Sequence, residues 1–237
     1  AETAERGGTI VIPSFAVGRT QELIYELNDL YENGGEFSEA LKSICVYVDS
    51  PMATIATEVF HKNARVFDEE YKQKVLAGDD PLDFPNLKFT KTTEESMALN
   101  TMKEPKIIIS ASGMCEAGRI RHHLKHHLWE PNSSVVFVGY QAEGTLGRRL
   151  IEGVKTVKLF GDEIYVNAHI YSLEGYSGHA DRNGLIAWAA GLRKPPAHLF
   201  LVHGELEAKQ ALARGIADAA GMHPTVVTEI AEFDLGN

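Results

Sequence analysis

The stretch GYSGHADRNG, residues 175–184, holds side chains that could do chemistry at close spacing. Ser177 is a candidate nucleophile, and His179 is a candidate proton carrier or metal ligand. A nucleophilic serine on a sharp strand-to-helix turn needs the pattern G-x-S-x-G, because the turn has no room for a side chain at the last position. His179 stands at that position. The pattern therefore disfavours a nucleophilic Ser177 and leaves His179 as an acid, a ligand or a turn residue.

A second histidine, His203, ends the apolar run HLFLVH at residues 198–203. An imidazole can ligate a metal as the neutral ring or donate a proton as the cation. His179 and His203 face one cleft if the strands before them are neighbours in the same sheet. Two histidines are fewer than the roughly three protein ligands of a catalytic zinc site. The alternative is that both rings only hydrogen-bond to nearby loops.

The densest group of histidines is RHHLKHH, residues 121–127. On a helix, His122 with His126 and His123 with His127 are separated by four residues, a spacing that lets two imidazoles share one ion. The glutamate of the zinc-protease pattern H-E-x-x-H is absent, because position 123 is histidine. We interpret the segment as a solvated basic helix face, on which any metal held by the chain would bind adventitiously.

Two loops rich in small residues, ASGMCEAGR (111–119) and GYQAEGTLGRR (139–149), precede predicted helices. Backbone N–H groups at a helix start can bind phosphate. Neither loop has the G-K-[ST] ending of a P-loop. The arginines Arg119, Arg148 and Arg149 are candidate phosphate partners, with ordinary surface residues as the alternative.

These residues follow a repeated order of strand, loop and helix. Apolar runs predict strands at 9–13, 43–48, 106–110 and 134–138. Helical periodicity predicts helices from residue 20 to Gly34, from 51 to about 76, over 118–128 and after the loop at 139, with at most short helical pieces between 78 and 97. This alternation predicts an α/β fold, a mostly parallel sheet flanked by helices. Ligands of such sheets bind at the carboxyl ends of the strands, which here carry Ser14, Asp49, Ser110, Ser112, Gly113 and Tyr140.

The pattern changes after residue 153. Alternating polar and apolar residues from 154 to 170, around Gly161-Asp162, predict a β-hairpin. A helix over 181–191, a strand over 198–203, a helix to about 219 and a last strand near 225–230 follow.

Composition narrows the classes of protein. The chain has 237 residues, a net charge of −10 and two cysteines outside any C-x-x-C pair. The charge disfavours a broad basic nucleic-acid-binding face, although a cleft can still bind phosphate. No apolar run approaches the roughly 20 residues of a membrane helix, so we expect a cytoplasmic protein without membrane contact. Residues 1–6 resemble the end of a helix stopped by Gly7-Gly8, so we expect the chain to begin inside a domain.

Six segments in order resemble the β-CASP branch of the metallo-β-lactamase superfamily, a branch of RNA-processing nucleases. They are IPSFAVGRTQELIYEL (12–27), VYVDSPMA (46–53), ASGMCEAGRIRHHL (111–124), VGYQAEGTLGRRL (138–150), YSGHAD (176–181) and LVHGE (201–205).

The resemblance implies a β-CASP domain over 1–173 and, over 174–237, the C-terminal return segment of an αββα metallo-β-lactamase domain. It implies a zinc-dependent ribonuclease that cuts RNA phosphodiester bonds in the cleft between the two domains. His179 becomes the catalytic general acid and His203 a zinc ligand. Ser177 and Gly178 lie near the phosphate. Ser112, Arg119 and Arg148 are the further candidates for binding RNA.

The chain departs from the family at the zinc motif. H-x-H-x-D-H does not occur in these 237 residues, and the family needs two zinc ions. We therefore expect the chain alone to be inactive, to hold no zinc tightly, and to self-associate or need the missing N-terminal metallo-β-lactamase portion. The alternatives are a non-catalytic RNA-binding or dimerisation module of the same fold, and a small-molecule metallohydrolase.

Overall fold

The computed structural model describes residues 1–173, 175 and 179–235. The chain divides into two compact units, residues 1–176 and 177–237, and each is described by itself.

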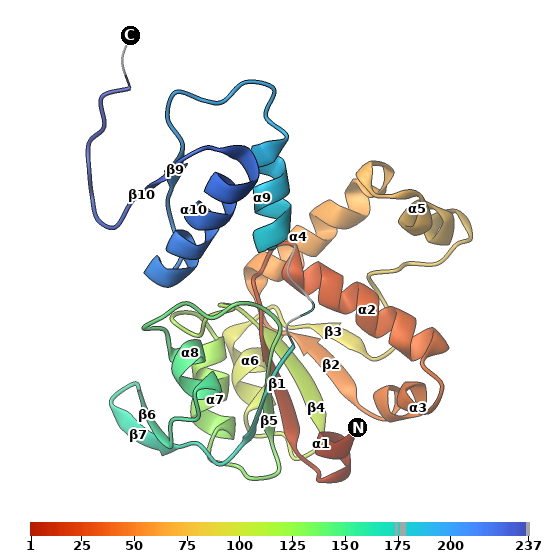
Figure 1. Cartoon of the computed structure of the whole chain (residues 1–237). Coiled ribbons are helices and arrows are strands. Elements are labelled where there is room, and N and C mark those ends of the chain that lie inside the picture. Colours follow the sequence, from red (N-terminus) through yellow and green to blue (C-terminus); the bar gives the residue numbers. More distant parts are fainter. Residues whose placement is uncertain (174, 176–178, 236–237) are drawn as a thin grey trace. The chain divides into compact units, whose positions relative to one another are not determined.

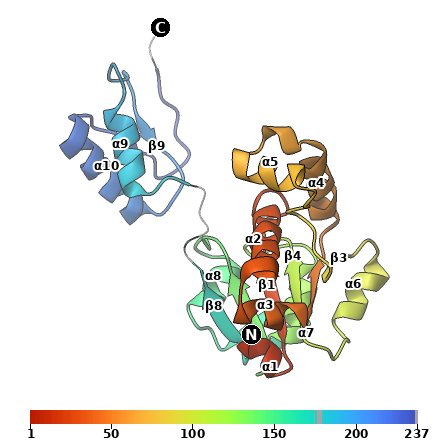
Figure 2. The same ribbon diagram turned by 90° about the vertical axis from the view of Figure 1, so that its right-hand side faces the viewer.

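The first unit is built on a six-stranded, wholly parallel sheet (Figures 1 and 2). Its strands are β1 (Thr9–Pro13), β2 (Cys45–Val48), β3 (Leu87–Phe89), β4 (Lys106–Ser110), β5 (Ser134–Phe137) and β8 (His169–Ser172), in the spatial order β3-β2-β4-β1-β5-β8. The predicted α/β class is confirmed. Both faces of the sheet are covered, which explains why the strands are continuous apolar runs.

Helices pack on both faces of this sheet, with successive side chains of a strand pointing to opposite faces. Ile10 and Ile12 of β1 belong to a core formed with α2, α3, α4 and α5, while Val11 between them packs against α7 and α8. The helices of the first unit are α1 (Glu2–Glu5), α2 (Arg19–Asn33), α3 (Glu36–Lys42), α4 (Pro51–Lys62), the 3-10 turn η1 (Ala64–Val66), α5 (Glu69–Leu76), α6 (Thr93–Leu99), α7 (Ile120–His127) and α8 (Leu146–Ile151).

Several elements differ from the sequence prediction. The helix expected from 51 to 76 is interrupted after α4, because η1 and the residues around Asp68, which caps α5, leave the helical path. The predicted hairpin exists as β6 (Thr156–Leu159) and β7 (Asp162–Tyr165). Residues 169–172, which include the end of the predicted hairpin, instead form β8 beside β5. The three-residue strand β3 was missed, because LKF is too short to show a pattern.

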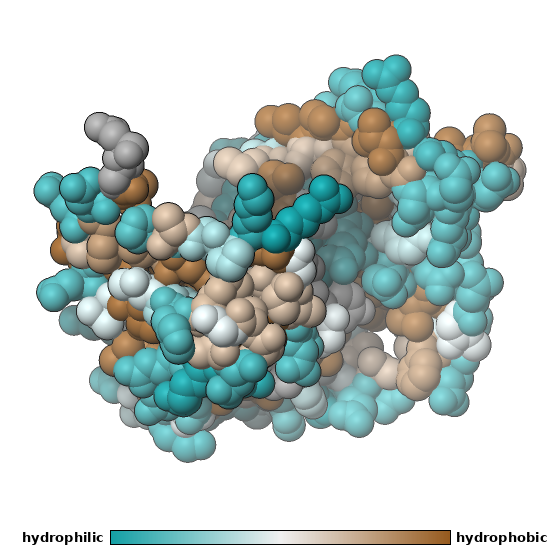
Figure 3. Space-filling model, turned by 45° about the horizontal axis from the view of Figure 1, so that its top comes forward, coloured by the Kyte–Doolittle hydropathy of each residue, from teal (hydrophilic) through white to brown (hydrophobic). Residues whose placement is uncertain are grey.

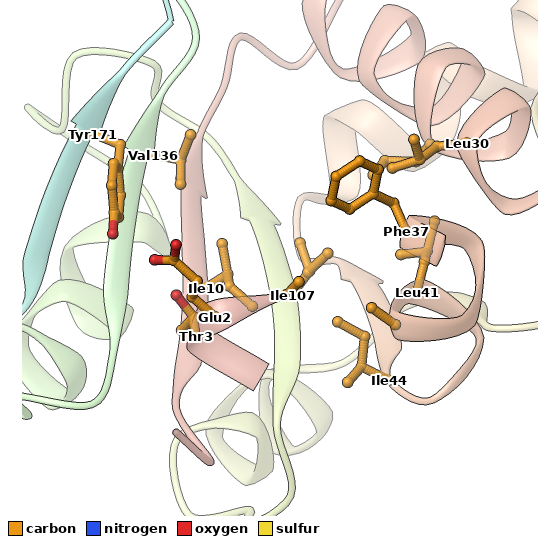
Figure 4. Close-up of a pocket in the computed structure, with 13 residues that line it drawn as sticks. Glu2, Thr3, Ile10, Leu30, Phe37, Leu41, Ile44, Ile107, Val136 and Tyr171 are labelled. Atoms are coloured by element: carbon orange, nitrogen blue, oxygen red, sulfur yellow. The ribbon is translucent and has the colours of Figure 1, made fainter. Parts of the chain in front are cut away.

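An apolar groove of about 430 Å³ lies on one side of the sheet. Ile10, Ile107 and Val136 line its floor, and Phe37 and Leu30 line its far wall (Figure 4). Exposed apolar side chains also occur on α4, at Met52, Ile55 and Val59, and brown groups are visible on the face shown in Figure 3.

The second unit contains α9 (Arg182–Ala190), β9 (Phe200–Leu201), α10 (Leu206–Ala220) and β10 (Thr225–Val226). β9 and β10 form a parallel pair, and α9 packs on α10 where Gly215 faces Ile186. Among the described residues, no helix is long and apolar enough to cross a membrane.

Candidate functional site

The carboxyl ends of the central strands bring several polar residues to one edge of the sheet. Pro13 of β1 pairs with Ser110 of β4, and Val48 of β2 pairs with Ile109. The strands are parallel, so the residues that follow them, Ser14 and Asp49, lie at the same edge. The Ser110 hydroxyl donates to the Asp49 carbonyl (2.8 Å), and the Ser14 amide donates to the Ser110 carbonyl (3.0 Å).

Asp49 is the centre of this edge. Its side chain is 0% exposed. Oδ1 accepts a hydrogen bond from Arg119 Nη1 (2.7 Å) and another from the Thr90 hydroxyl, and Oδ2 accepts from the Ser96 hydroxyl (2.6 Å) and from His123 Nε2 (2.6 Å). The four donors come from three parts of the chain. The carboxylate therefore connects β2 to the residue after β3, to α6 and to α7.

These donors keep Asp49 ionised. Burial by itself raises the pKa of the carboxyl group, but the hydrogen bonds from His123, Ser96 and Thr90 outweigh burial and bring the pKa well below its usual range. The buried charge is thus compensated, which is the condition for a buried ion to be tolerated.

The interpretation of residues 121–127 as a solvated basic face is wrong for half of its histidines. His123 is 0% exposed and His127 is 2% exposed, whereas His122 and His126 are exposed. Both ring nitrogens of His123 have partners, since Nδ1 lies 2.7 Å from Asn100 Oδ1. His127 Nδ1 lies 2.8 Å from Glu130 Oε2. The reason is helical geometry: positions 123, 124, 127 and 128 form one stripe that faces the sheet.

Arg119 and Ser112 lie in the loop after β4. The Arg119 side chain is 22% exposed and forms an ion pair with Asp49. This ion pair anchors the end of the loop. The Ser112 hydroxyl accepts from the Ala117 amide (3.3 Å). Gly118 closes the loop with φ +82°, and a Cβ there would meet the Ala111 carbonyl oxygen at 2.5 Å. Only glycine fits this turn.

Arg148 lies in α8, after the loop that follows β5. Its Nε donates to Glu152 Oε1 (2.6 Å), and Nη1 donates to the Gln141 carbonyl (3.4 Å). The loops after β4 and β5 are joined, because Gln141 Nε2 donates to the Gly113 carbonyl (3.0 Å) and the Gly147 amide donates to the Met114 carbonyl (3.2 Å). Arg119 and Arg148 thus belong to loops that are bonded to each other.

The two candidate catalytic histidines belong to the second unit. His179 is exposed and lies two residues before Asp181, which caps α9 through a bond from the Gly184 amide (2.7 Å). His203 is exposed, follows β9 with φ +63° and lines a shallow pocket with Lys209 and Val227. Ser177 and Gly178 lie outside the described residues.

The strand pattern would bring His179 and His203 to one cleft only if the strands before them were neighbours in one sheet, and the described strands do not meet that condition. β8, the last described strand before His179, belongs to the six-stranded sheet, whereas β9 pairs with β10. The two histidines therefore do not follow neighbouring strands of one sheet. Within the described ranges, no three histidine, cysteine, aspartate or glutamate side chains are grouped as a metal site would require.

The sequence identified Asp49 only as one polar residue at a strand end and did not reveal its hydrogen-bond partners. Thr90, Ser96 and His123 are far from Asp49 in the chain. The one available signal was the coincidence of an acid after β2 with an arginine and a histidine at the start of the helix after β4.

Comparison with known proteins agrees with this architecture. Residues 20–150 match the Beta-Casp domain, and residues 163–227 match the Zn-dependent metallo-hydrolase RNA specificity domain. The chain belongs to the β-CASP family of metallo-β-lactamase nucleases.

Curated relatives cover most of the chain. It is 38% identical over 216 residues to ribonuclease TTHA0252 of Thermus thermophilus, covering 91% of this chain and 48% of that protein. It is 35% identical to the transcription termination factor FttA of Methanocaldococcus jannaschii, covering 86% of this chain and 32% of the relative, and 34% identical to an RNase J-like protein of that organism, covering 86% and 45%. The chain thus spans about half the length of these relatives or less.

We predict that Asp49→Asn lowers the free energy of unfolding at pH 7 by about 3 to 5 kcal/mol, because it removes one side of a buried ion pair. Thr90→Val, which leaves the other donors in place, lowers it by about 1 kcal/mol. Urea unfolding of the chain measures both. Asp83→Asn, at an exposed aspartate, is the control and changes stability by less than about 0.5 kcal/mol.

Wild type and Asp49→Asn also test whether Asp49 is ionised, through the pH dependence of their stability. The folded-state pKa of Asp49 is lowered, so its contribution is present above the unfolded-state pKa of about 4 and is lost as the pH falls below that value. The stability gap between wild type and Asp49→Asn narrows from pH 7 to pH 3. A gap that is constant over this range contradicts an ionised Asp49.

Proposed function

We propose that this chain is part of a ribonuclease that hydrolyses RNA phosphodiester bonds. Residues 1–173 supply the β-CASP domain and residues 174–237 the return segment of the metallo-β-lactamase domain. The observation that carries the proposal is the match of residues 163–227 to a metallo-hydrolase RNA specificity domain, because this range contains both His179 and His203. The similarity to ribonuclease TTHA0252 over 91% of the chain supports it further.

His179 is the proposed general acid. It is exposed, and it precedes a helix whose N-terminus is capped by Asp181. A protonated imidazole at this position donates its proton to the oxygen that leaves phosphorus when the phosphodiester bond breaks. The backbone of Gly178 and the hydroxyl of Ser177 are proposed to contact the same phosphate.

The proposal that zinc takes part rests on family membership alone. The described residues do not fit a complete zinc site, since they contain no group of three potential ligands and a catalytic site takes about three. We propose that His203 supplies one ligand in a protein that also carries the H-x-H-x-D-H motif. Bound zinc would supply the Lewis acid and the activated water. The 237 residues by themselves are proposed to hold no tight zinc and to cleave no RNA.

The loops at the carboxyl edge are the proposed RNA contacts. Ser112, Arg119 and Arg148 lie in or just after the loops that follow β4 and β5, the edge where parallel sheets bind ligands. Arg119 presents one guanidinium nitrogen to Asp49 and is still partly exposed, so a phosphate would be bound by a side chain that Asp49 already orients. Arg148 is the more exposed of the two.

A second candidate is a role in ending transcription. It is favoured by the similarity to FttA proteins, which are named transcription termination factors and share 30–35% identity with this chain. RNA binding would then matter more than RNA cleavage. Binding without detectable cleavage by a protein that carries the complete zinc motif would favour this candidate.

We predict that His179→Ala, made in a protein in which this chain is joined to the H-x-H-x-D-H portion, lowers RNA cleavage by about 10²- to 10⁴-fold and leaves the zinc content unchanged. His203→Ala lowers both. Cleavage assays and elemental analysis of the same preparations measure the two effects. Loss of zinc from His179→Ala would show that His179 is a ligand instead of the acid.

We predict that Arg148→Ala weakens binding of single-stranded RNA and lowers the slope of log affinity against log salt by about 0.7, the value for one phosphate contact. Arg149→Ala, on the neighbouring and more exposed position of α8, is the matched control. Fluorescence anisotropy at several salt concentrations measures the slopes. Equal slopes for wild type and Arg148→Ala would remove Arg148 from the RNA contact.

A further inference from the structure

A second pocket, of about 260 Å³, opens between α2, α4 and α5, and none of the residues proposed to bind RNA lines it. Aromatic rings form much of its wall: Tyr25, Phe60, Phe67 and Tyr71. The Phe67 ring lies between two others: its centroid is 5.2 Å from that of Phe60 and 4.6 Å from that of Tyr71. Tyr71 is buried, and the other three are half-buried. The contacts between the rings hold the wall in place. α2, α4 and α5 are visible side by side in Figures 1 and 2.

All the charged side chains that line the pocket are acidic. Glu22, Asp68 and Glu70 line it and are exposed, and none of its described lining residues is lysine, arginine or histidine. Asp68 Oδ1 accepts from the Tyr71 amide (2.9 Å), and Glu70 Oε1 accepts from the Tyr25 hydroxyl (2.8 Å).

Two of these carboxylates use only part of their hydrogen-bonding capacity. Among the contacts of the described residues, Asp68 and Glu70 each use one side-chain oxygen. The second oxygen of each is available to a donor from outside. Glu22 is paired with Arg19, which neutralises part of the charge at one side of the pocket.

The structure already contains one ammonium group against this aromatic wall. Lys74 Nζ lies 4.7 Å from the centroid of the Tyr25 ring and 3.5 Å from Asp29 Oδ1. The chain therefore already places one ammonium group near an aromatic ring and a carboxylate, the two kinds of group that attract a cation. Lys74 itself does not line the pocket.

Two kinds of ligand could use aromatic walls. A nucleotide could stack its base on them, but the three carboxylates would repel its phosphate. An organic cation gains from both features, because aromatic faces attract a weakly hydrated ammonium and carboxylates offset its charge. We propose that this pocket binds an organic ammonium ion, either a free amine or an alkylated lysine side chain of a protein. The proposal does not depend on the nuclease activity.

The test is a titration of the 237-residue chain, followed by amide chemical shifts in NMR. Choline is the probe, and 3,3-dimethylbutan-1-ol is its neutral counterpart with the same shape. Choline is expected to shift signals of α2, α4 and α5 in a saturable way and to bind roughly fivefold or more tightly than the alcohol. Spermidine and a peptide with trimethyl-lysine are titrated next, and the tighter of the two identifies the source of the ammonium group.

Two variants localise the binding. Glu70→Gln is expected to weaken choline binding by about threefold or more, whereas Glu69→Gln, an exposed neighbour on the same helix that does not line the pocket, leaves it unchanged. Equal binding of choline and the alcohol, tighter binding of guanosine monophosphate, an equal effect of both variants, or no shifts with choline would each overturn the proposal.

Discussion

The burial of one ionised carboxylate is the constraint on which the carboxyl edge of the sheet depends. Asp49 has no exposed side-chain surface, so water cannot solvate its charge and protein donors must do so. The donors are Arg119, His123, Ser96 and Thr90. They come from parts of the chain that the sheet alone does not hold together. Satisfying Asp49 therefore links the end of β2 to α6 through Ser96, to the residue after β3 and to the start of α7.

The two loops that are proposed to contact RNA are held in place by the same ion pair. Arg119 is both the partner of Asp49 and the last residue of the ASGMCEAGR loop, so the loop is anchored at its end while Gly118 makes the turn before it. The neighbouring loop after β5 is bonded to it through Gln141 and Gly147. A phosphate-binding loop needs fixed N–H groups and fixed cations, because ordering them during binding costs entropy. Removing one partner of a buried ion pair is costly, although replacing the whole pair by apolar residues often is not. The contribution of the Asp49 pair that matters at this edge is therefore the geometry that it holds.

Much of the fold could be predicted from sequence, because β-branched runs such as TIVIP and KIIIS end in glycine, proline or serine. β3 and β8 could not be predicted, since three residues carry no period and β8 owes its place to pairing with β5. His123 was misread because local charge dominated the interpretation. Its burial follows from its place on the stripe of α7 that faces the sheet, and its partner there is a carboxylate 74 positions away. His179 and His203 were found from the residue pattern. The resemblance assigned their roles, and those roles stay predictions.

Hydrogen exchange of the backbone amides tests the role of Asp49 most directly. In Asp49→Asn, compared with wild type and with Asp83→Asn, the account predicts faster exchange over residues 90–100 and 111–123, which contain the donors, and unchanged exchange in α2 and in residues 179–235. Unchanged exchange over 90–100 and 111–123, or an equal increase throughout the chain, would contradict the claim that this one carboxylate organises the edge.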